Sequence, residues 1–238
     1  MGSGIAQVAA QAGHDVVVYD QQRAALDRAE NALKSTLAKL VEKGKISDQD
    51  SASIFGRVGF RETIDSLSSC GLVIEAIVEN LDVKKSVFQS LEKLVSSDCI
   101  LATNTSSLSV TAIAAACSKP ERFIGIHFFN PAPLMPLVEI IPALQSNTDL
   151  AGKCAELMRS WGKVPVVCKD TPGFIVNRVA RPYYSEALRI YDEGIADMAT
   201  IDAAMRNVGF RMGPFELMDM LAHHVNYTVT ACVFAAMY

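Results

Sequence analysis

Residues 72–76 read Leu72-Val73-Ile74-Glu75-Ala76, a short apolar run with a carboxylate near its end. A helical pattern follows through residues 83–94, and a second apolar run, Ile100-Leu101-Ala102-Thr103, comes next. Short β-branched strands that alternate with helices are typical of a parallel sheet covered by helices on both faces. This stretch therefore predicts an α/β fold.

The same alternation extends to either side of that stretch. Residues 4–12 predict a helix of small residues, and residues 16–20 (Val16-Val17-Val18-Tyr19-Asp20) predict a buried strand that closes on an acidic residue. An amphipathic helix is expected over residues 23–42, and a further strand over Phe123-Ile124-Gly125-Ile126.

The pattern changes after Val164-Pro165-Val166-Val167-Cys168, because the apolar spacing then becomes helical. The segment Asp170-Thr171-Pro172-Gly173 predicts a hinge, with Pro172 suited to the first turn of a helix. We therefore expect a sheet domain over residues 1–169 and a helical domain over residues 170–238.

The composition narrows the class of function. The chain has 238 residues, half of them hydrophobic, and a net charge of -4. The acidic balance argues against a nucleic-acid partner, and no apolar run is long enough to predict a membrane span. The six cysteines are scattered without paired spacing, which predicts reduced, mostly buried thiols in a cytoplasmic protein and no metal site.

A histidine and a carboxylate stand out from the apolar runs around them. The segment His127-Phe128-Phe129-Asn130-Pro131 is followed by Leu137-Val138-Glu139-Ile140-Ile141. Two adjacent strands of this kind bring an imidazole and a carboxylate within hydrogen-bonding reach, as a general base near neutral pH requires. The alternative is a strand-end histidine satisfied by backbone, with Glu139 as a surface charge.

The N-terminal residues give partial evidence for a dinucleotide site. Met1-Gly2-Ser3-Gly4 matches the end of a glycine-rich phosphate turn and the helix behind it, which places the first strand of the motif upstream of Met1. Asp20 ends the next strand, where a carboxylate accepts hydrogen bonds from the adenine ribose and disfavours NADP. A plain packing helix and an ordinary strand-end carboxylate are the alternatives.

Six ordered motifs make the chain resemble the L-3-hydroxyacyl-CoA dehydrogenases over essentially its whole length. They cover residues 1–7 (MGSGIAQ), 75–80 (EAIVEN), 103–107 (TNTSS), 127–131 (HFFNP), 171–178 (TPGFIVNR) and 212–217 (MGPFEL). Within that family, residues 178–187 are most similar to the bacterial phenylacetate-pathway branch, which acts on 3-hydroxyadipyl-CoA. The resemblance implies a Rossmann-type doubly wound, mostly parallel sheet that lacks its first strand, followed by an all-α domain.

The resemblance also implies an activity: the reversible, NAD-dependent oxidation of L-3-hydroxyacyl-CoA to 3-ketoacyl-CoA in fatty acid or phenylacetate degradation. His127 would take the proton of the 3-hydroxyl, and Glu139 would hold the charge that develops on the imidazole. Ser106 would hydrogen-bond the substrate oxygen, and Asn177 would position the imidazole or the same oxygen.

The ligand contacts carried over from the family fall on two sets of residues. The expected NAD contacts are Gly2, Asp20, Glu79, Lys84, Asn104, Ser106 and Asn130. Thr36 and Lys43 are expected to contact coenzyme A. Without the family match, Glu79 and Lys84 would be interpreted as a helix-start acid and a solvated lysine.

Some features depart from the family and leave alternatives open. A C-terminal segment of the family is absent after Tyr238, and Pro136 stands where lysine is common. In the family the helical domain normally forms a homodimer, so the resemblance implies a homodimer through residues 170–238. The chain is therefore expected to be a fragment of an active enzyme, or the product of a misplaced start codon. The other readings are an L-gulonate or crystallin-type dehydrogenase on the same scaffold and a non-catalytic fragment.

Overall fold

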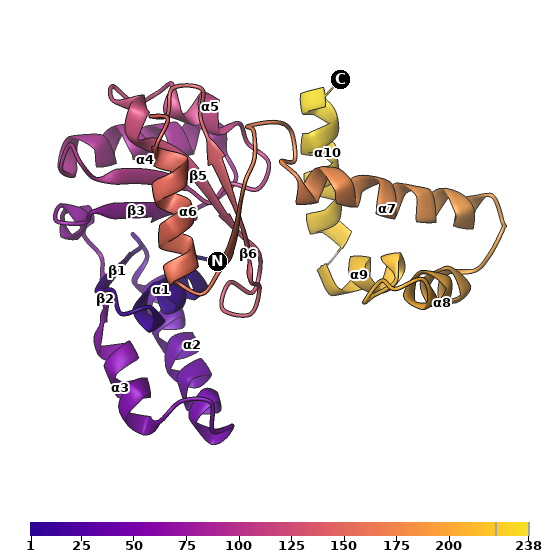
Figure 1. The fold of residues 1–238 in the computed structure, drawn as a ribbon, viewed down its shortest axis with the longest axis horizontal. Helices are drawn as coiled ribbons and strands as arrows, with labels where there is room; N and C mark the ends of the chain where they lie inside the picture. The colour runs from indigo at the N-terminus through magenta and orange to yellow at the C-terminus, as the bar shows by residue number, and fades with distance from the viewer. Residues whose placement is uncertain (222, 238) are drawn as a thin grey trace. The chain divides into compact units, whose positions relative to one another are not determined.

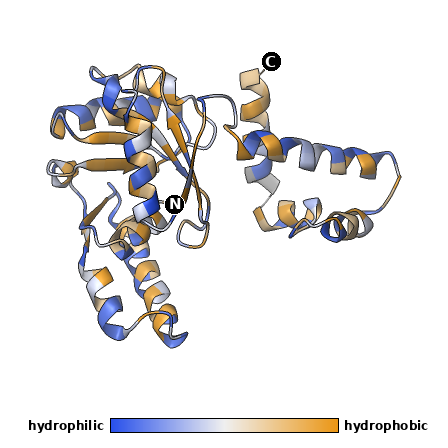
Figure 2. Cartoon of the chain, viewed as in Figure 1, coloured by the Kyte–Doolittle hydropathy of each residue, from blue (hydrophilic) through white to orange (hydrophobic). Residues whose placement is uncertain are grey.

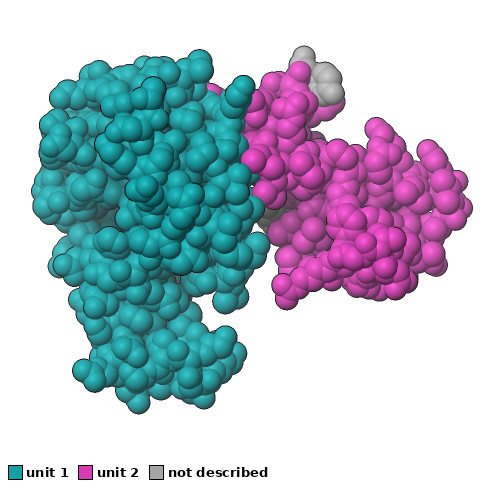
Figure 3. All heavy atoms as spheres, viewed as in Figure 1, with its two compact units in different colours: residues 1–105, 110–170 teal, residues 106–109, 171–238 magenta. Residues whose placement is uncertain are grey.

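The computed structural model describes residues 1–221 and 223–237, without the side chains of residues 223–225. These residues form two compact units, which are coloured separately in Figure 3. Unit 1 contains residues 1–105 and 110–170, and unit 2 contains residues 106–109 and 171–238. Every described strand belongs to unit 1, whereas unit 2 is helical.

Unit 1 contains two sheets, ordered β1-β2 and β3-β4-β5-β6-β7. Its strands are β1 (Val16–Tyr19), β2 (Val58–Arg61), β3 (Leu72–Glu75), β4 (Ile100–Thr103), β5 (Phe123–Phe128), β6 (Leu137–Pro142) and β7 (Val164–Val167). Its α-helices are α1 (Gly2–Gln11), α2 (Arg23–Glu42), α3 (Asp48–Gly56), α4 (Leu81–Leu94), α5 (Val110–Ala114) and α6 (Leu150–Ser160). Every described strand pair is parallel except β5 with β6.

This topology confirms the predicted α/β fold with a mostly parallel sheet. The two sheets separate between β1 and β3, each of which has one strand neighbour. The sequence analysis did not predict β2 or α3.

Helices cover both faces of the larger sheet (Figure 1). On one face, Ile5 of α1 and Met158 of α6 share a core with Ile124, Ile126 and Ile140. On the other face, the Phe88 ring of α4 lies 4.6 Å from the ring of Phe123. Figure 2 shows the apolar strands between helices with mixed surfaces. Because side chains alternate along a strand, His127 points to the same face as Phe123.

The cysteines and the helix lengths can be compared with two predictions, one about reduced, mostly buried thiols and one about membrane spans. All six cysteines are free, and Cys99, Cys117 and Cys154 are buried while the other three are half-buried. Burial raises the pKa of each of these three buried thiols to about 11, which keeps them protonated near neutral pH. Among the described residues, no helix has the length and hydropathy needed to cross a membrane.

Unit 2 is built from helices α7 (Val176–Asp192), α8 (Met198–Asn207), α9 (Pro214–Leu221) and α10 (His223–Met237). Tyr184 of α7 shares a buried cluster with residues of α8 and α9. The buried carboxylate of Asp202 accepts hydrogen bonds from the backbone N–H groups of Phe215 and Glu216, at 2.9 and 3.1 Å. This carboxylate satisfies otherwise unpaired donors at the start of α9.

The expectation that Pro172 starts a helix is wrong. Residues 172–175 form turns, and α7 begins only at Val176. Gly173 and Phe174 have φ angles of 75° and 48°, which are in the left-handed region and interrupt a right-handed helix.

Candidate active site

A buried imidazole–carboxylate pair lies between β5 and β6. His127 and Glu139 are opposite each other in the antiparallel register, and His127 Nδ1 lies 2.7 Å from Glu139 Oε2. His127 is 5% exposed and Glu139 is 1% exposed. A carboxylate at Nδ1 favours the tautomer with the proton on that nitrogen, and it stabilises the imidazolium. Glu139 is therefore not a surface charge.

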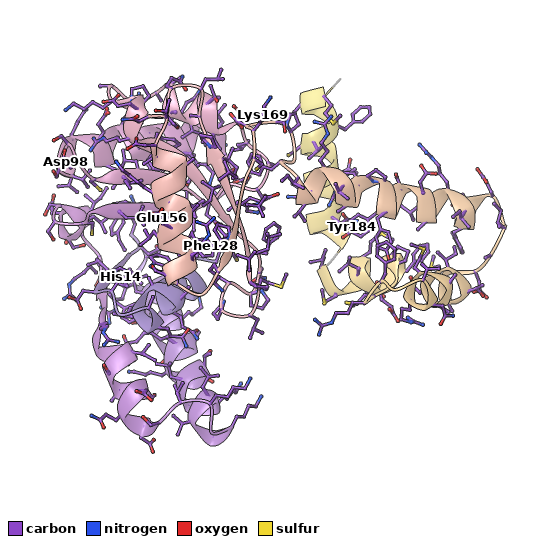
Figure 4. The ribbon with its side chains drawn as sticks, in the orientation of Figure 1. His14, Asp98, Phe128, Glu156, Lys169 and Tyr184 are labelled. Atoms are coloured by element: carbon purple, nitrogen blue, oxygen red, sulfur yellow. The ribbon has the colours of Figure 1, made fainter. Side chains whose placement is uncertain are left out.

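The end of β5 is fixed by the residue that follows β4. Asn104 Oδ1 accepts a hydrogen bond of 2.8 Å from the N–H of Phe128, which is labelled in Figure 4. The Asn104 N–H donates to the carbonyl oxygen of Glu75 at 2.8 Å. Asn104 thus ties the ends of β3, β4 and β5 together, directly beside His127. The Phe129 ring lies 4.5 Å from the imidazole.

A second buried charge cluster lies at the same ends of β3 and β4. Lys84 Nζ lies 2.6 Å from Glu75 Oε1 and 3.2 Å from Glu79 Oε2. Thr103 donates to Glu75 at 2.7 Å, and Thr105 donates to Glu79 at 2.5 Å. Lys84 is 1% exposed, so it is not a solvated lysine. Glu75 also accepts from the N–H of Ile77 at 2.7 Å, so three donors satisfy its carboxylate.

The other residues predicted to bind NAD include three near strand or helix ends. Asp20 follows β1 and accepts from the N–H of Gln22 at 2.8 Å, and Asn130 is exposed after β5. Gly2 starts α1, and a Cβ added there would lie 3.8 Å from Ala76, just beyond β3. The N-terminus of α1 therefore lies at the carboxyl ends of the parallel strands, where open α/β sheets bind their ligands.

Two predicted site residues meet in unit 2. Asn177, in the first turn of α7, donates from Nδ2 to the backbone carbonyl of Ser106 at 3.1 Å. Ser106 lies in the 106–109 segment, which leaves unit 1 and returns to it. The contact fixes the Asn177 amide against the backbone of Ser106.

The predicted coenzyme A contacts lie on the second helix. Thr36 Oγ1 donates to the carbonyl of Ala32 at 2.8 Å, and Lys43 is exposed at the C-cap of α2. Their roles stay predictions. In the described part of the chain, no three His, Cys, Asp or Glu side chains form a group that suits a metal ion.

Two residues that organise these loops were missed in the sequence analysis. Glu75 joins the ends of β3 and β4, and the signal was a carboxylate closing an apolar run, as at Asp20. Asp170 accepts from the N–H groups of Val110 and Thr111, at 3.1 and 2.7 Å, and so caps α5. Its partners are about sixty residues away in the sequence, so no local pattern predicts them.

Comparison with known proteins assigns both parts of the chain. Residues 1–171 match the family described as "3-hydroxyacyl-CoA dehydrogenase, NAD binding domain", and residues 173–238 match its C-terminal domain. The chain belongs to the 3-hydroxyacyl-CoA dehydrogenase family. This membership confirms the resemblance, and it makes unit 1 the family's NAD-binding part.

Relatives of this chain differ in length. It is 48% identical to a 3-hydroxyadipyl-CoA dehydrogenase of Escherichia coli, covering 99% of this chain and 50% of the relative. It is 44% identical to a probable 3-hydroxybutyryl-CoA dehydrogenase of Deinococcus radiodurans, covering 93% of this chain and 80% of the relative. A solved 3-hydroxybutyryl-CoA dehydrogenase of Escherichia coli has a TM-score of 0.97 and 47% identity, covering 100% of this chain and 50% of that one.

The buried pair predicts how activity depends on His127. His127→Gln is expected to lower kcat by about 10²–10⁴-fold, because it removes the imidazole that is predicted to act as the general base. Glu139→Gln is expected to lower kcat as well, because a neutral amide stabilises the imidazolium less. His14→Gln is the matched control, since His14 is exposed and packs beside Trp161 instead. The steady-state rate of NADH oxidation compares the three variants. Equal rates for His127→Gln and His14→Gln would contradict the predicted role of His127.

The lysine cluster predicts a stability effect. Lys84→Met is expected to lower the free energy of unfolding by about 3–5 kcal/mol, because it leaves the buried Glu75 carboxylate without its cation. Adding Glu75→Gln to that variant is expected to restore part of the loss. Lys153→Met removes an exposed ion pair with Asp149 and should leave the unfolding free energy nearly unchanged, because water screens that pair. Urea titration followed by circular dichroism measures the free energy of unfolding of each variant. A similar decrease in Lys84→Met and Lys153→Met would refute the stabilising role of the buried Lys84–Glu75 pair.

Proposed function

We propose that the chain catalyses the reversible oxidation of L-3-hydroxyacyl-CoA to 3-ketoacyl-CoA with NAD as the oxidant. The observation that carries the proposal is the buried His127–Glu139 pair at 2.7 Å, in a chain that belongs to this dehydrogenase family. An alcohol oxidation needs a proton acceptor beside the carbon that loses hydride, and this pair supplies one.

The roles of the residues follow from their hydrogen bonds. Nδ1 of His127 is engaged by Glu139, so the proposal assigns proton transfer with the 3-hydroxyl to Nε2. Bound NAD would supply the acceptor for the hydride that leaves C3. Ser106 and Asn177 would then hold the oxygen as it becomes a carbonyl, and their mutual contact keeps them fixed for that purpose.

The residues at the carboxyl ends of the strands fit a dinucleotide. The N-terminus of α1 carries Gly2 and Ser3, which lets a pyrophosphate approach the backbone closely. The Asp20 carboxylate, exposed after β1, suits the hydroxyls of a ribose. Glu79 and Asn104 are held in place by Thr105 and Phe128, so their ligand-facing loops are fixed in advance.

The acyl group is the open part of this proposal. The relatives include a 3-hydroxyadipyl-CoA and a probable 3-hydroxybutyryl-CoA dehydrogenase. The adipyl chain is two carbons longer than the butyryl chain and ends in a carboxylate. The sugar-acid alternative, an L-gulonate type of dehydrogenase, is not supported by any feature of the site.

The proposal predicts turnover of NADH with acetoacetyl-CoA, followed as the loss of absorbance of the reduced cofactor. Activity should depend on His127 and should be absent with free acetoacetate, and L-gulonate mixed with NAD should give no rise in the absorbance of the reduced cofactor. Fluorescence titration with NADH separates the alternatives. A folded chain that binds NADH but turns over only L-gulonate would favour the sugar-acid enzyme, and one that does not bind NADH would favour a non-catalytic fragment.

We also propose that the chain works in the cytoplasm as a homodimer formed by unit 2. Large apolar side chains are exposed on its helices and loops, among them Val208, Phe210, Met220, Tyr227 and Phe234. Exposed apolar groups of this number favour a protein contact. Light scattering coupled to size exclusion should report twice the mass of one chain for the wild type. The mass measured for Phe210→Glu should be smaller. A monomer at micromolar concentration, or recovery of the chain outside the cytoplasmic fraction, would contradict this proposal.

A further inference from the structure

The carboxylate of Asp170 joins the two segments at which the chain passes out of unit 1. The chain leaves unit 1 after Thr105, returns to it at Val110, and leaves it again after Asp170. One oxygen of Asp170 accepts from the N–H of Val110 at 3.1 Å, and the other accepts from the N–H of Thr111 at 2.7 Å. Both donors lie in the first turn of α5, where a helix has no backbone acceptor to offer them. Asp170 therefore fixes the point at which the chain returns from residues 106–109.

That return point is packed into the core beside β5. Val110 is 0% exposed, and a Cβ added to Gly125 would lie 2.9 Å from Val110 Cγ2. The glycine thus leaves room for the Val110 side chain. Gly125 and His127 are two residues apart on β5, so their side-chain positions face the same way. Asp170 therefore holds the start of α5 against the face of β5 that carries His127.

The four residues before the return point include Ser106, and the chain is held on both sides of them. On the entry side, the Thr105 hydroxyl donates to Glu79 at 2.5 Å. On the exit side, Asp170 accepts its two hydrogen bonds from α5. Between them, the carbonyl of Ser106 accepts from Asn177 at 3.1 Å. A loop this short with fixed ends has few backbone conformations, and this restriction fixes the direction of the Ser106 side chain.

We infer that Asp170 is a positioning residue for the reaction and that it acts through Ser106. The inference rests on the proposed function, in which the Ser106 hydroxyl holds the oxygen on C3. Asp170→Asn replaces one acceptor oxygen with an NH₂ group, which cannot accept from a backbone N–H. The variant therefore loses one hydrogen bond to α5, and the other is weakened because the charge is gone. A small displacement of a group that contacts the reacting atoms lowers kcat steeply.

A double-mutant cycle between Asp170→Asn and Ser106→Ala tests the inference, with kcat measured as NADH oxidation by acetoacetyl-CoA. Asp170→Asn alone is expected to lower kcat about 10-fold. In the Ser106→Ala background the same substitution should change kcat by less than about 2-fold, because the hydroxyl that it would displace is already absent. A merely structural role of Asp170 would instead lower kcat by the same factor in both backgrounds.

Glu92→Gln is the matched control. The Glu92 carboxylate also accepts from two consecutive backbone N–H groups of unit 1, those of Ser118 and Lys119, each at 2.7 Å. These groups precede the amino end of β5, whereas His127 lies near its carboxyl end. Glu92→Gln removes the same kind of hydrogen bond as Asp170→Asn, and it should leave kcat unchanged.

Two measurements without turnover separate the inference from the proposed function. Hydrogen exchange followed by mass spectrometry should be faster at residues 106–111 in Asp170→Asn, and it should be unchanged there in Glu92→Gln. Calorimetry of acetoacetyl-CoA with the NAD-bound chain repeats the cycle without reaction, because the oxidised cofactor has no hydride to give. The effects of Asp170→Asn and Ser106→Ala on this affinity should again be non-additive.

The outcomes fall into distinct cases. Equal effects of Asp170→Asn in both backgrounds, or unchanged exchange at residues 106–111, overturn the inference. Non-additive binding by a chain that does not turn over acetoacetyl-CoA would overturn the proposed function and support the role of Asp170. A folded chain that does not bind acetoacetyl-CoA would overturn both.

Discussion

The antiparallel register of β5 and β6 is the constraint on which the candidate site depends. In that register His127 lies opposite Glu139, and both side chains point to the same face of the sheet. A shift of one residue would turn one of the two side chains to the opposite face. The register is held by apolar neighbours on the other face, such as Ile126 opposite Ile140. Core packing thus sets the chemistry of the site.

A second constraint fixes the loops around that pair. Strand ends in a parallel sheet have no turn to hold them, because each chain leaves for a helix. Here Glu75 supplies the missing connection, since its carboxylate accepts from the Thr103 hydroxyl and the Lys84 ammonium. Its carbonyl oxygen also accepts from Asn104, whose side chain holds the N–H of Phe128. The path from β3 to the residue beside His127 therefore consists of short hydrogen bonds.

The sequence predicted local features better than distant contacts. The helix from Arg23 to Glu42 and the His127–Glu139 contact are confirmed, because each is visible in a local apolar pattern. Strand β2 was missed, since four residues that include Gly59 and Arg61 show little strand character. The prediction of a helix start at Pro172 was wrong because the next two residues adopt positive φ angles, which depend on the folded hinge. The burial of Lys84 depends on tertiary packing around the β3–α4 turn, which no local pattern specifies.

The buried charges of the two units are balanced in different ways. His127 with Glu139 is a matched pair whose net charge changes by one when the imidazole takes a proton. Around Lys84, two carboxylates share one ammonium, and two threonine hydroxyls help to satisfy them. Arg181 differs from both, because the hydrogen bonds that its Nε and Nη1 donate end on uncharged acceptors. These neutral acceptors hold the guanidinium between α7 and α10.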